Sequence, residues 1–542
     1  MSQIQVRAIR PAADPVRPAV TAVSLMLLTA VVAVVLFVAL RSPLKDDIAW
    51  LLYVARRWLD GRELYVDVVE VNPPLIIWLS AIPIRLADWL NTSSQITVIP
   101  YFIAIVLGCA FWTASLLRPM GGLFSNRLLV FAVLGIVLLV VPAAELGQRE
   151  HLLVAAVLPY LVLFARSLDG EKPRAAPAIA AGVLAGLGCA LKPRYGAMFP
   201  VLECLALAFG LRPWRALPLA ACTALVGYVG MVAVLCPAYM HRAVPLALAL
   251  YGATDVSFVH MLAVCARVML CLAAAFLLYW SRRRVMAERS LMLTLLVFAA
   301  TSIAICVVDG KDWFYHRLPA TIVVILALAL GVASILYRRS VLPWRRLLWP
   351  LAIAGIAGLV LSVALVQRLT PDVALAVEPR DSTIARLERV VRAQHARSYV
   401  AFSEWIALGF PVVNATGVTW SSRFDSMWAL KGELWRARFD PTAAKEWPVS
   451  RWVVHDFITG CPDLAVVDVR TGENWVGILS ATNPTFARAW SQYRLIDAFD
   501  GLAVYRRTTP GCITPWVASA GSPGTEVTAG KAGDVAGSRH GL

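Results

Sequence analysis

Long apolar segments alternate with short polar segments up to about residue 370 of the chain. The runs at 19–40, 96–117, 128–142 and 347–366 contain almost no charged side chains. A helix needs roughly 20 apolar residues to span the hydrocarbon core of a bilayer. Because backbone groups in lipid must bond within the spanning segment, these runs are predicted to be transmembrane helices.

The whole pattern predicts about eleven membrane-spanning helices, which together form an all-α polytopic bundle over residues 19–369. The expected spans lie near residues 19–40, 95–117, 127–142, 151–167, 177–191, 197–211, 216–236, 261–280, 290–308, 318–337 and 347–367. The first outer loop, residues 41–94, is much longer than the connections that follow it.

Segment 72–90 within this loop is the ambiguous element. It is apolar, but Pro83 interrupts it and it carries Arg85 and Asp88. Asn72 is suited to cap a helix and Pro73 to occupy its first turn. We predict a helix that lies on the outer surface or enters the membrane only partway. A full crossing would reverse the side of every later loop.

Composition supports a membrane protein and argues against one that binds nucleic acid. Hydrophobic residues make up 59% of the chain and charged residues 15%, with a mean hydropathy of +0.70. Soluble domains are about a quarter charged. The net charge is +16, but Lys and Arg occur in short runs between apolar segments, such as SRRRVMAER at 281–289. Such runs orient helices and meet anionic headgroups, so these loops and residues 1–18 are predicted to be cytoplasmic.

The pattern changes near residue 370, where apolar runs become shorter and charged, Trp and turn residues increase. We predict a mixed α/β domain over residues 370–516 on the outer side, and we expect the protein in a bacterial inner membrane with this domain in the periplasm. Asp500-Gly501 lies between two apolar runs and predicts a β-hairpin. Residues 517–542 are rich in Gly, Ala and Ser without periodicity and are predicted to be a disordered tail.

The ten cysteines fall into two groups. Eight lie in or beside apolar helices without the spacing of metal ligands, and are expected to be small core residues. Cys461 and Cys512 lie in the outer domain. They can form a disulfide in an exported domain, or they can be free and unrelated.

The first outer loop carries the densest polar pattern, KDDIAWLLYVARRWLDGRELYVDVVEVNPPL at 45–75. Two carboxylates, Asp46 and Asp47, follow the first helix directly. An amphipathic helix is expected next, because Trp50, Val54 and Trp58 recur at helical spacing. A glycine turn then leads to further polar and aromatic residues and to the Asn-Pro-Pro-Leu sequence.

This loop resembles that of the GT-C superfamily of membrane glycosyltransferases, of the protein O-mannosyltransferase and lipid A aminoarabinose transferase type. The matching positions are Asp46, Asp47, Trp50, Gly61, Tyr65, Asp67 and Pro73-Pro74-Leu75. The resemblance covers about 35 residues directly, and many spans followed by a small outer domain also fit the family. The second acidic position is often Glu in the family and is Asp47 in this chain.

Three later segments resemble the family more weakly. Glu150 is the nearest match to an acidic residue that begins a helix after the second outer loop, with Glu145 in reserve. Lys192 takes the place of a basic residue that ends a helix. Tyr315 and His316 lie in a Tyr-His-x-Leu-Pro pattern that some bacterial members have.

The resemblance implies an inverting hexosyl- or pentosyltransferase that moves a sugar from a polyprenyl-phosphate-linked donor to an acceptor on the outer face. Such a reaction needs a base for the acceptor hydroxyl, here Asp46 with its pKa tuned by burial and by Asp47, and cations for the leaving phosphate. The catalytic candidates are Asp46, Asp47 and Glu150. The candidates for binding the donor phosphate are Lys192, Arg194, Lys311 and Arg149. The candidates for other substrate contacts are Trp50, Tyr65, Asp67, Glu70, Tyr315 and His316.

Each of these residues also has a purely structural explanation. Asp46 and Asp47 can stabilise the positive end of the loop helix, and Glu150 can cap the next one. Lys192 can extend to lipid headgroups. His316 can be a packed loop residue.

Other functions and cofactors also remain open at this point. A transporter or flippase of a lipid-linked substrate would need ionisable groups at the membrane midplane, where few are found. An inactive relative could serve as an assembly subunit. No cofactor is firmly assigned, although Asp46 and Glu150 could hold Mg²⁺ or Mn²⁺. The expected partners are the lipid bilayer, the polyprenyl-phosphate-linked sugar and a cell-envelope glycan, lipid or protein acceptor, and not nucleic acid.

Overall fold

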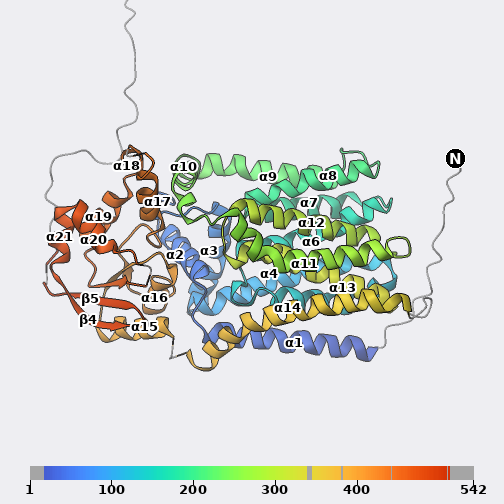
Figure 1. The fold of residues 1–542 in the computed structure, drawn as a ribbon, viewed down its shortest axis with the longest axis horizontal. Helices are drawn as coiled ribbons and strands as arrows, with labels where there is room; N and C mark the ends of the chain where they lie inside the picture. Colours follow the sequence, from blue (N-terminus) through green and yellow to red (C-terminus); the bar gives the residue numbers. More distant parts are fainter. Residues whose placement is uncertain are drawn as a thin grey trace, which may run out of the picture.

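A computed structural model of the chain describes residues 18–337, 345–379, 382–440, 442–470, 472–509 and 511–512. It shows a bundle of long helices with an α/β domain packed against one end, which we call the domain end of the bundle (Figure 1). The predicted cytoplasmic N-terminus, apart from Pro18, and the predicted disordered tail at 517–542 lie outside the described residues.

Each of the expected spans is helical. The bundle helices are α1 (Pro18–Arg41), α4 (Ser94–Leu117), α5 (Arg127–Val140), α6 (Arg149–Leu168), α7 (Ala175–Ala190), α8 (Met198–Ala208), α9 (Ala216–Leu235), α11 (Phe258–Arg282), α12 (Arg289–Asp309), α13 (Phe314–Tyr337) and α14 (Arg345–Val377). Within the described residues, eight helices are long and apolar enough to cross a membrane, namely α1, α4, α6, α9, α11, α12, α13 and α14. Helices α5, α7 and α8 are shorter, with 14, 16 and 11 residues.

Two predicted helix ends are wrong. Helix α8 ends at Ala208 rather than at 211, because Gly210 adopts a left-handed conformation with φ of 75°. Helix α14 continues past the predicted domain boundary at 369 to Val377. The polar residues of its extension have partners at the domain end, since Asp372 accepts a hydrogen bond from the backbone N–H of Ala144 at 3.1 Å.

The connections of the bundle divide into two sets. The long first loop and the connections 141–148, 191–197, 236–257 and 310–313 lie at the domain end, where α14 also finishes (Figure 1). The connections 118–126, 169–174, 209–215 and 283–288, which carry basic residues, lie at the opposite end. The connections at the domain end also carry basic residues, such as Lys192, Arg194 and Lys311, so the two sets differ chiefly in the many carboxylates of the first loop.

Two shorter helices of the first loop, α2 (Asp46–Leu59) and α3 (Pro74–Trp89), lie between the bundle and the domain (Figure 1). Among the described residues, helix α3 has 16 residues and, like α5, α7 and α8, is not one of the eight helices that are long and apolar enough to cross a membrane. It is tied to α2 by two hydrogen bonds from Arg56 to Asp88, of 2.9 and 2.7 Å. The helix begins at Pro74 with Pro73 as its cap residue, so the predicted capping role of Asn72 is wrong. The Asn72 amide instead bonds Glu70.

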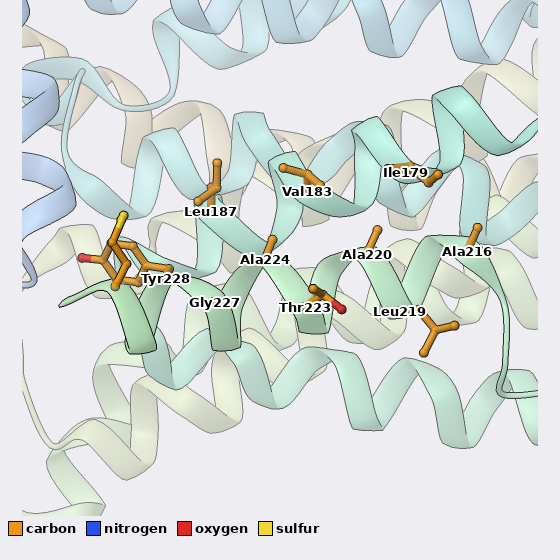
Figure 2. A pocket seen from close by; sticks show the side chains of 11 residues that line it. Ile179, Val183, Leu187, Ala216, Leu219, Ala220, Thr223, Ala224, Gly227 and Tyr228 are labelled. Carbon is orange, nitrogen blue, oxygen red and sulfur yellow. The ribbon is translucent and has the colours of Figure 1, made fainter. Parts of the chain in front are cut away.

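Helices α7 and α9 pack closely because small residues lie between them. A Cβ atom at Gly182 would come within 2.5 Å of the Leu217 carbonyl oxygen, so only glycine permits this approach. An apolar groove of about 630 Å³ runs along the pair. Figure 2 shows it extending from Ile179 and Ala216 to Tyr228. The Tyr228 hydroxyl accepts a hydrogen bond from the Leu75 backbone N–H at 3.1 Å, so the groove ends beside the first loop.

The C-terminal domain is a five-stranded mixed sheet with helices, as predicted. The strand order is β2-β1-β3-β5-β4, with β1 parallel to β2 and β3, and with β5 antiparallel to β3 and β4. The strands are β1 (Ser398–Phe402), β2 (Thr419–Trp420), β3 (Leu464–Asp468), β4 (Tyr493–Phe499) and β5 (Leu502–Arg507). The helices are α15 (Thr383–Ala393), α16 (Val412–Thr416), α17 (Trp428–Ala437), α18 (Ala443–Glu446), α19 (Val449–Gly460), α20 (Trp475–Thr482) and α21 (Pro484–Trp490).

The predicted hairpin joins β4 and β5. Asp500 and Gly501 both have positive φ, 51° and 72°, which is the conformation that Asp-Gly favours in a two-residue turn.

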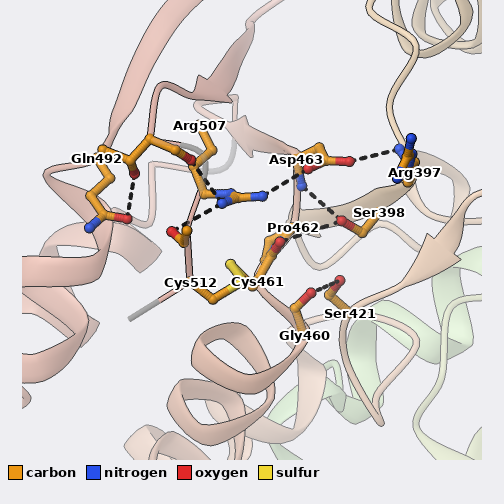
Figure 3. A network of polar contacts seen from close by, with 12 residues as sticks. Arg397, Ser398, Ser421, Gly460, Cys461, Pro462, Asp463, Gln492, Arg507 and Cys512 are labelled. Atoms are coloured by element: carbon orange, nitrogen blue, oxygen red, sulfur yellow. Dashed lines mark hydrogen bonds and ion pairs between the residues drawn. A yellow bond between two sulfur atoms is a disulfide. The ribbon is translucent and has the colours of Figure 1, made fainter. Parts of the chain in front are cut away.

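Cys461 and Cys512 form a disulfide beside this sheet (Figure 3). Figure 3 also shows Asp463 accepting hydrogen bonds from Arg397 and Arg507, at 2.8 and 2.9 Å.

The domain is docked firmly on the loops of the bundle. The Val69 backbone N–H donates to the Arg423 carbonyl at 2.8 Å, and the Asn414 amide donates to the Ala49 carbonyl at 3.0 Å. The α17 helix lies against α10 (Val244–Leu250) so closely that a Cβ on Gly432 would meet the Leu250 carbonyl at 2.5 Å. Side chains of the domain are therefore held in place over the first loop.

Candidate functional site

Several helix ends meet where the bundle faces the domain. Helices α2, α6 and α13 begin here, and α7 ends here before a 3-10 helix at Pro193–Ala197. Their polar side chains form one cluster, which we call the central site. It contains Asp47, Arg149, Glu150, Lys192, Tyr315 and His316.

The two aspartates that begin α2 have different surroundings. Asp46 pairs with Lys45 at 3.2 Å, and its carboxylate accepts the backbone N–H of Asp47 at 2.9 Å. That bond is the helix-stabilising arrangement considered from the sequence. Asp47 instead accepts a hydrogen bond from the Gln148 amide at 3.1 Å, across to the start of α6. Asp47 is therefore the member of the pair that faces the central site.

The environment of Asp47 suits a group that gains and loses a proton near neutral pH. Burial, followed by the adjacent charge of Asp46, raises the pKa of Asp47 to about 6. The positive charges of Arg149 and Lys45 oppose this shift. A base with a pKa close to the working pH is mostly ionised yet still able to accept a proton.

Arg149 is a buried cation that forms no direct ion pair with the residues that the structure describes. It is the first residue of α6, is 3% exposed, and lies 5.8 Å from the centre of the Tyr315 ring. Its Nε has no hydrogen-bond partner, and none of the described carboxylates forms an ion pair with it. A helix N-terminus with an unpaired guanidinium is a site for an anion.

Glu150 and Lys192 form an ion pair beside Arg149. The distance from Lys192 Nζ to Glu150 Oε1 is 2.9 Å, and Glu150 is fully buried. Burial lowers the pKa of Lys192 to about 8, although the charge of Glu150 opposes the shift. Lys192 also lies 5.8 Å from the centre of the Tyr315 ring. Its charge is therefore held in the site rather than extended to lipid headgroups.

Asp309 organises the next part of the cluster. One of its oxygens pairs with Arg194, and the other pairs with Nδ1 of His316. His316 is 4% exposed, and its Nε2 has no hydrogen-bond partner among the described residues. The Tyr195 hydroxyl donates to the His316 carbonyl at 3.3 Å. Arg194 is thus neutralised by Asp309, whereas the imidazole keeps one free nitrogen.

Lys311 lies at the edge of the cluster, against the domain. It pairs with Asp255 at 2.5 Å, donates to the Tyr251 carbonyl at 2.5 Å and stands 4.2 Å from the Tyr251 ring centre. Burial lowers its pKa. The other edge of the Tyr251 ring meets Trp428 of the domain, with 5.2 Å between the ring centres. Tyr251 therefore contacts both Lys311 and the domain residue Trp428.

The first-loop candidates mainly bond to one another. Trp50 donates to Glu70, which also accepts from the Asn72 backbone N–H at 2.7 Å. The Tyr65 hydroxyl donates to the Asn72 carbonyl at 2.9 Å. Asp67 is exposed and accepts the Glu63 backbone N–H at 2.9 Å, within the turn. The structure thus gives Trp50, Tyr65 and Asp67 structural bonds and does not bring them into the central site.

Sequence reasoning missed two residues of this region. Gln148 was not selected, although it ties Asp47 to α6. Asp425 belongs to the domain and accepts a hydrogen bond from the Trp428 indole at 2.8 Å. Burial and then the charge of Glu70 raise the pKa of Asp425 to about 8. No local motif marks Asp425, because its neighbours in the site are more than 350 residues away in the chain.

A divalent metal at Asp46 and Glu150 stays a prediction. In the parts of the chain that the structure describes, no group of three or more His, Cys, Asp or Glu side chains is placed to share an ion. Glu150 is occupied by Lys192 and Asp46 by Lys45. The arrangement offers cations for an anionic ligand more readily than oxygens for a metal.

This fold defines a class of architecture, a polytopic bundle of apolar helices with an α/β domain at one end. The chain is similar to the crystal structure of ArnT from Cupriavidus metallidurans bound to undecaprenyl phosphate, with a TM-score of 0.51 and 13% sequence identity. The match covers 89% of this chain and 97% of that one. No protein-family model matches the sequence, and no curated protein matches it. The predicted fold class is confirmed.

Proposed function

We propose that the protein is an inverting membrane glycosyltransferase that takes its sugar from a polyprenyl-phosphate carrier. The observation that carries this proposal is Arg149, a buried guanidinium at a helix N-terminus that forms no direct ion pair within the described part of the chain. Keeping such a charge buried is costly unless an anion binds there. The undecaprenyl phosphate bound by the similar ArnT supports the same class of ligand.

The central site would hold the phosphate between Arg149 and Lys192. Both cations stand over Tyr315, and both are supported by fixed helix ends. Preorganised positive charge of this kind stabilises a leaving phosphate as its bond to the sugar breaks. Arg194 and Lys311 already have carboxylate partners and would act at longer range.

Asp47, rather than Asp46, is the better placed base. The acceptor hydroxyl would give its proton to the Asp47 carboxylate while its oxygen forms a bond to the anomeric carbon of the sugar. The bond from that carbon to the phosphate oxygen would break, and its electron pair would stay on the phosphate. One direct displacement of this kind inverts the anomeric configuration.

The groove between α7 and α9 would hold the isoprenoid chain. It is lined by apolar side chains and ends near Tyr228, and α7 itself ends two residues before Lys192 (Figure 2). An isoprenoid in this groove would therefore leave its phosphate close to the cations.

Two features support the assignment of the domain end of the bundle to the outer side of the membrane, namely the charge of the connections and the disulfide. The connections at the end opposite the domain carry more basic than acidic residues, and basic loops favour the cytoplasm. A Cys461–Cys512 disulfide is suited to an oxidising compartment. We therefore assign the domain to the periplasmic face of a bacterial inner membrane and the acceptor to the cell envelope.

The test is binding of undecaprenyl phosphate to the purified protein, followed by transfer from undecaprenyl-phosphate-linked sugars. Arg149→Gln should weaken binding by about tenfold or more, because a charge-assisted phosphate contact is lost. Arg166→Gln is the matched control, since Arg166 lies at the other end of α6 and pairs with Glu171 at 2.7 Å. Equal affinity of the Arg149→Gln variant and the control would refute the phosphate site. Flipping of the lipid without any transfer product would instead favour a flippase.

A further inference from the structure

His316 is the buried polar group that the proposed reaction leaves without a role. Its Nδ1 is held by Asp309, and its Nε2 has no partner among the described residues although the side chain is only 4% exposed. A buried polar atom that bonds nothing is costly and calls for an explanation. The ring is fixed between Trp313 and Tyr315, with ring centres 5.6 and 4.7 Å away, so it cannot turn freely to find a partner.

The charges that act on this imidazole come from several elements around it. Those acting on it are Lys192 and Arg194 after α7, Arg149 at the start of α6 and Lys311 before α13. All of these are positive, and Asp309 at the end of α12 is the carboxylate that contacts the ring. Burial first, and then these positive charges, oppose a second proton on the ring until a negative charge enters the cluster.

We propose that His316 takes up one proton when the phosphate of the lipid carrier binds, and then donates a hydrogen bond from Nε2 to a phosphate oxygen. This inference rests on the proposed function, since it needs a phosphate in the central site. The proton comes from solvent and stays on the ring while the phosphate is bound. Asp309 accepts from Nδ1 and keeps the imidazolium oriented, as a carboxylate does behind other functional histidines. Asp309 is thus a positioning residue that acts through His316.

The consequence is that binding of a phosphate of constant charge weakens as pH rises. The probe is a polyprenyl methyl phosphodiester, which keeps a single negative charge across the range. The protein is the Asp47→Asn variant, because ionisation of Asp47 near pH 6 would itself repel the phosphate. From about pH 5.5 to about pH 7.5 this variant should lose about tenfold or more in affinity, and calorimetry in two buffers should show uptake of about one proton.

Asp47→Asn/His316→Gln should lose less than about threefold over the same interval and take up almost no proton. Lys192 and Glu145 have pKa values of about 8 and about 7, but both residues are present in the two variants. Their titration therefore cannot cause a difference between the variants. Asp47→Asn/Asp309→Asn should also take up less proton, which tests the inference even if the glutamine variant folds poorly. Identical pH dependence and uptake with and without His316 would overturn the inference. Absence of binding at every pH by the Asp47→Asn protein would overturn the proposed function itself.

Discussion

Adjacent aspartates in α2 illustrate how much depends on single side chains. The sequence selected both and favoured Asp46 as the base. The structure ties Asp46 to Lys45 and to the helix backbone, whereas Asp47 reaches Gln148 across the site. The direction of a side chain at a helix start depends on what packs against that start, and a single sequence does not contain this information. The pairing of Glu150 with Lys192 was hidden for the same reason.

Asp47→Asn should lower kcat by about 10²- to 10⁴-fold, because an amide cannot accept the proton of the acceptor hydroxyl. Asp46→Asn is the matched control and should lower kcat by less than about tenfold, since the Asp46 carboxylate serves the helix start. Steady-state transfer with a polyprenyl-phosphate-linked sugar measures both. A larger loss for Asp46→Asn than for Asp47→Asn would show that the base was assigned to the wrong residue.

The pH dependence of kcat/KM should be bell-shaped, with limbs near pH 6 and pH 8. Asp47 must be ionised to act as base and has a pKa of about 6, so activity rises through that pH. Lys192 must be protonated to bind phosphate and has a pKa of about 8, so activity falls through that pH. Lys192→Arg should move the upper limb to higher pH, because guanidinium stays charged. An unchanged upper limb in this variant would exclude Lys192 as its source.

The contribution of Asp47 to the free energy of unfolding should fall as pH rises towards 6, whereas activity should rise over the same range. The folded-state pKa of Asp47 is raised from 3.8, so the folded protein favours the protonated acid. Its contribution to stability is complete below about pH 4 and is lost as pH rises towards 6. Ionisation of Asp47, which the proposed reaction needs, therefore lowers the free energy of unfolding.

Whole helices were easier to predict from the sequence than single contacts. The apolar runs identified the bundle helices because the requirement to satisfy backbone groups in lipid leaves little choice of structure. Helix ends were less certain. Helix α14 continues to Val377 because Asp372 and Arg41 make bonds there that no local pattern shows. The close approach of α7 and α9 is visible in the sequence only as the Gly182 and Gly186 spacing.

Gly227→Leu should weaken binding of undecaprenyl phosphate by about threefold to tenfold, because the added side chain enters the α7–α9 groove. A Cβ at Gly227 meets nothing within 4 Å, so the variant should fold normally. Gly230→Leu is the matched control, since Gly230 is on the same helix, is equally open, and does not line the groove. Lipid titration together with the melting temperature separates the two effects. Equal affinity of both variants would place the isoprenoid elsewhere.

At the scale of the whole molecule, the sequence predicted two parts and their order but not how they meet. The first loop and the domain meet through contacts such as Val69 with Arg423 and Trp50 with Phe410, whose ring centres are 4.8 Å apart. Asp425 enters the region only through this docking. Contacts between residues so distant in the chain depend on the final fold, so no local pattern could have placed Asp425 beside Glu70.

The arrangement of the whole chain across the membrane leads to the last prediction, which also decides the course of the first loop. Single cysteines at His455 in the domain, Ser93 after α3 and Arg284 in the α11–α12 connection are all at exposed positions. A membrane-impermeant maleimide applied to intact spheroplasts should label His455→Cys and Ser93→Cys and leave Arg284→Cys unlabelled until the membrane is opened. Both are labelled only if α3 stays on the outer side, because a crossing would move residue 93, and every later segment including the domain, to the opposite face. Unmodified protein measures the background from native cysteines. Labelling of Arg284→Cys with protection of Ser93→Cys would show that α3 crosses, and would separate Asp47 from the carrier phosphate that it is proposed to serve.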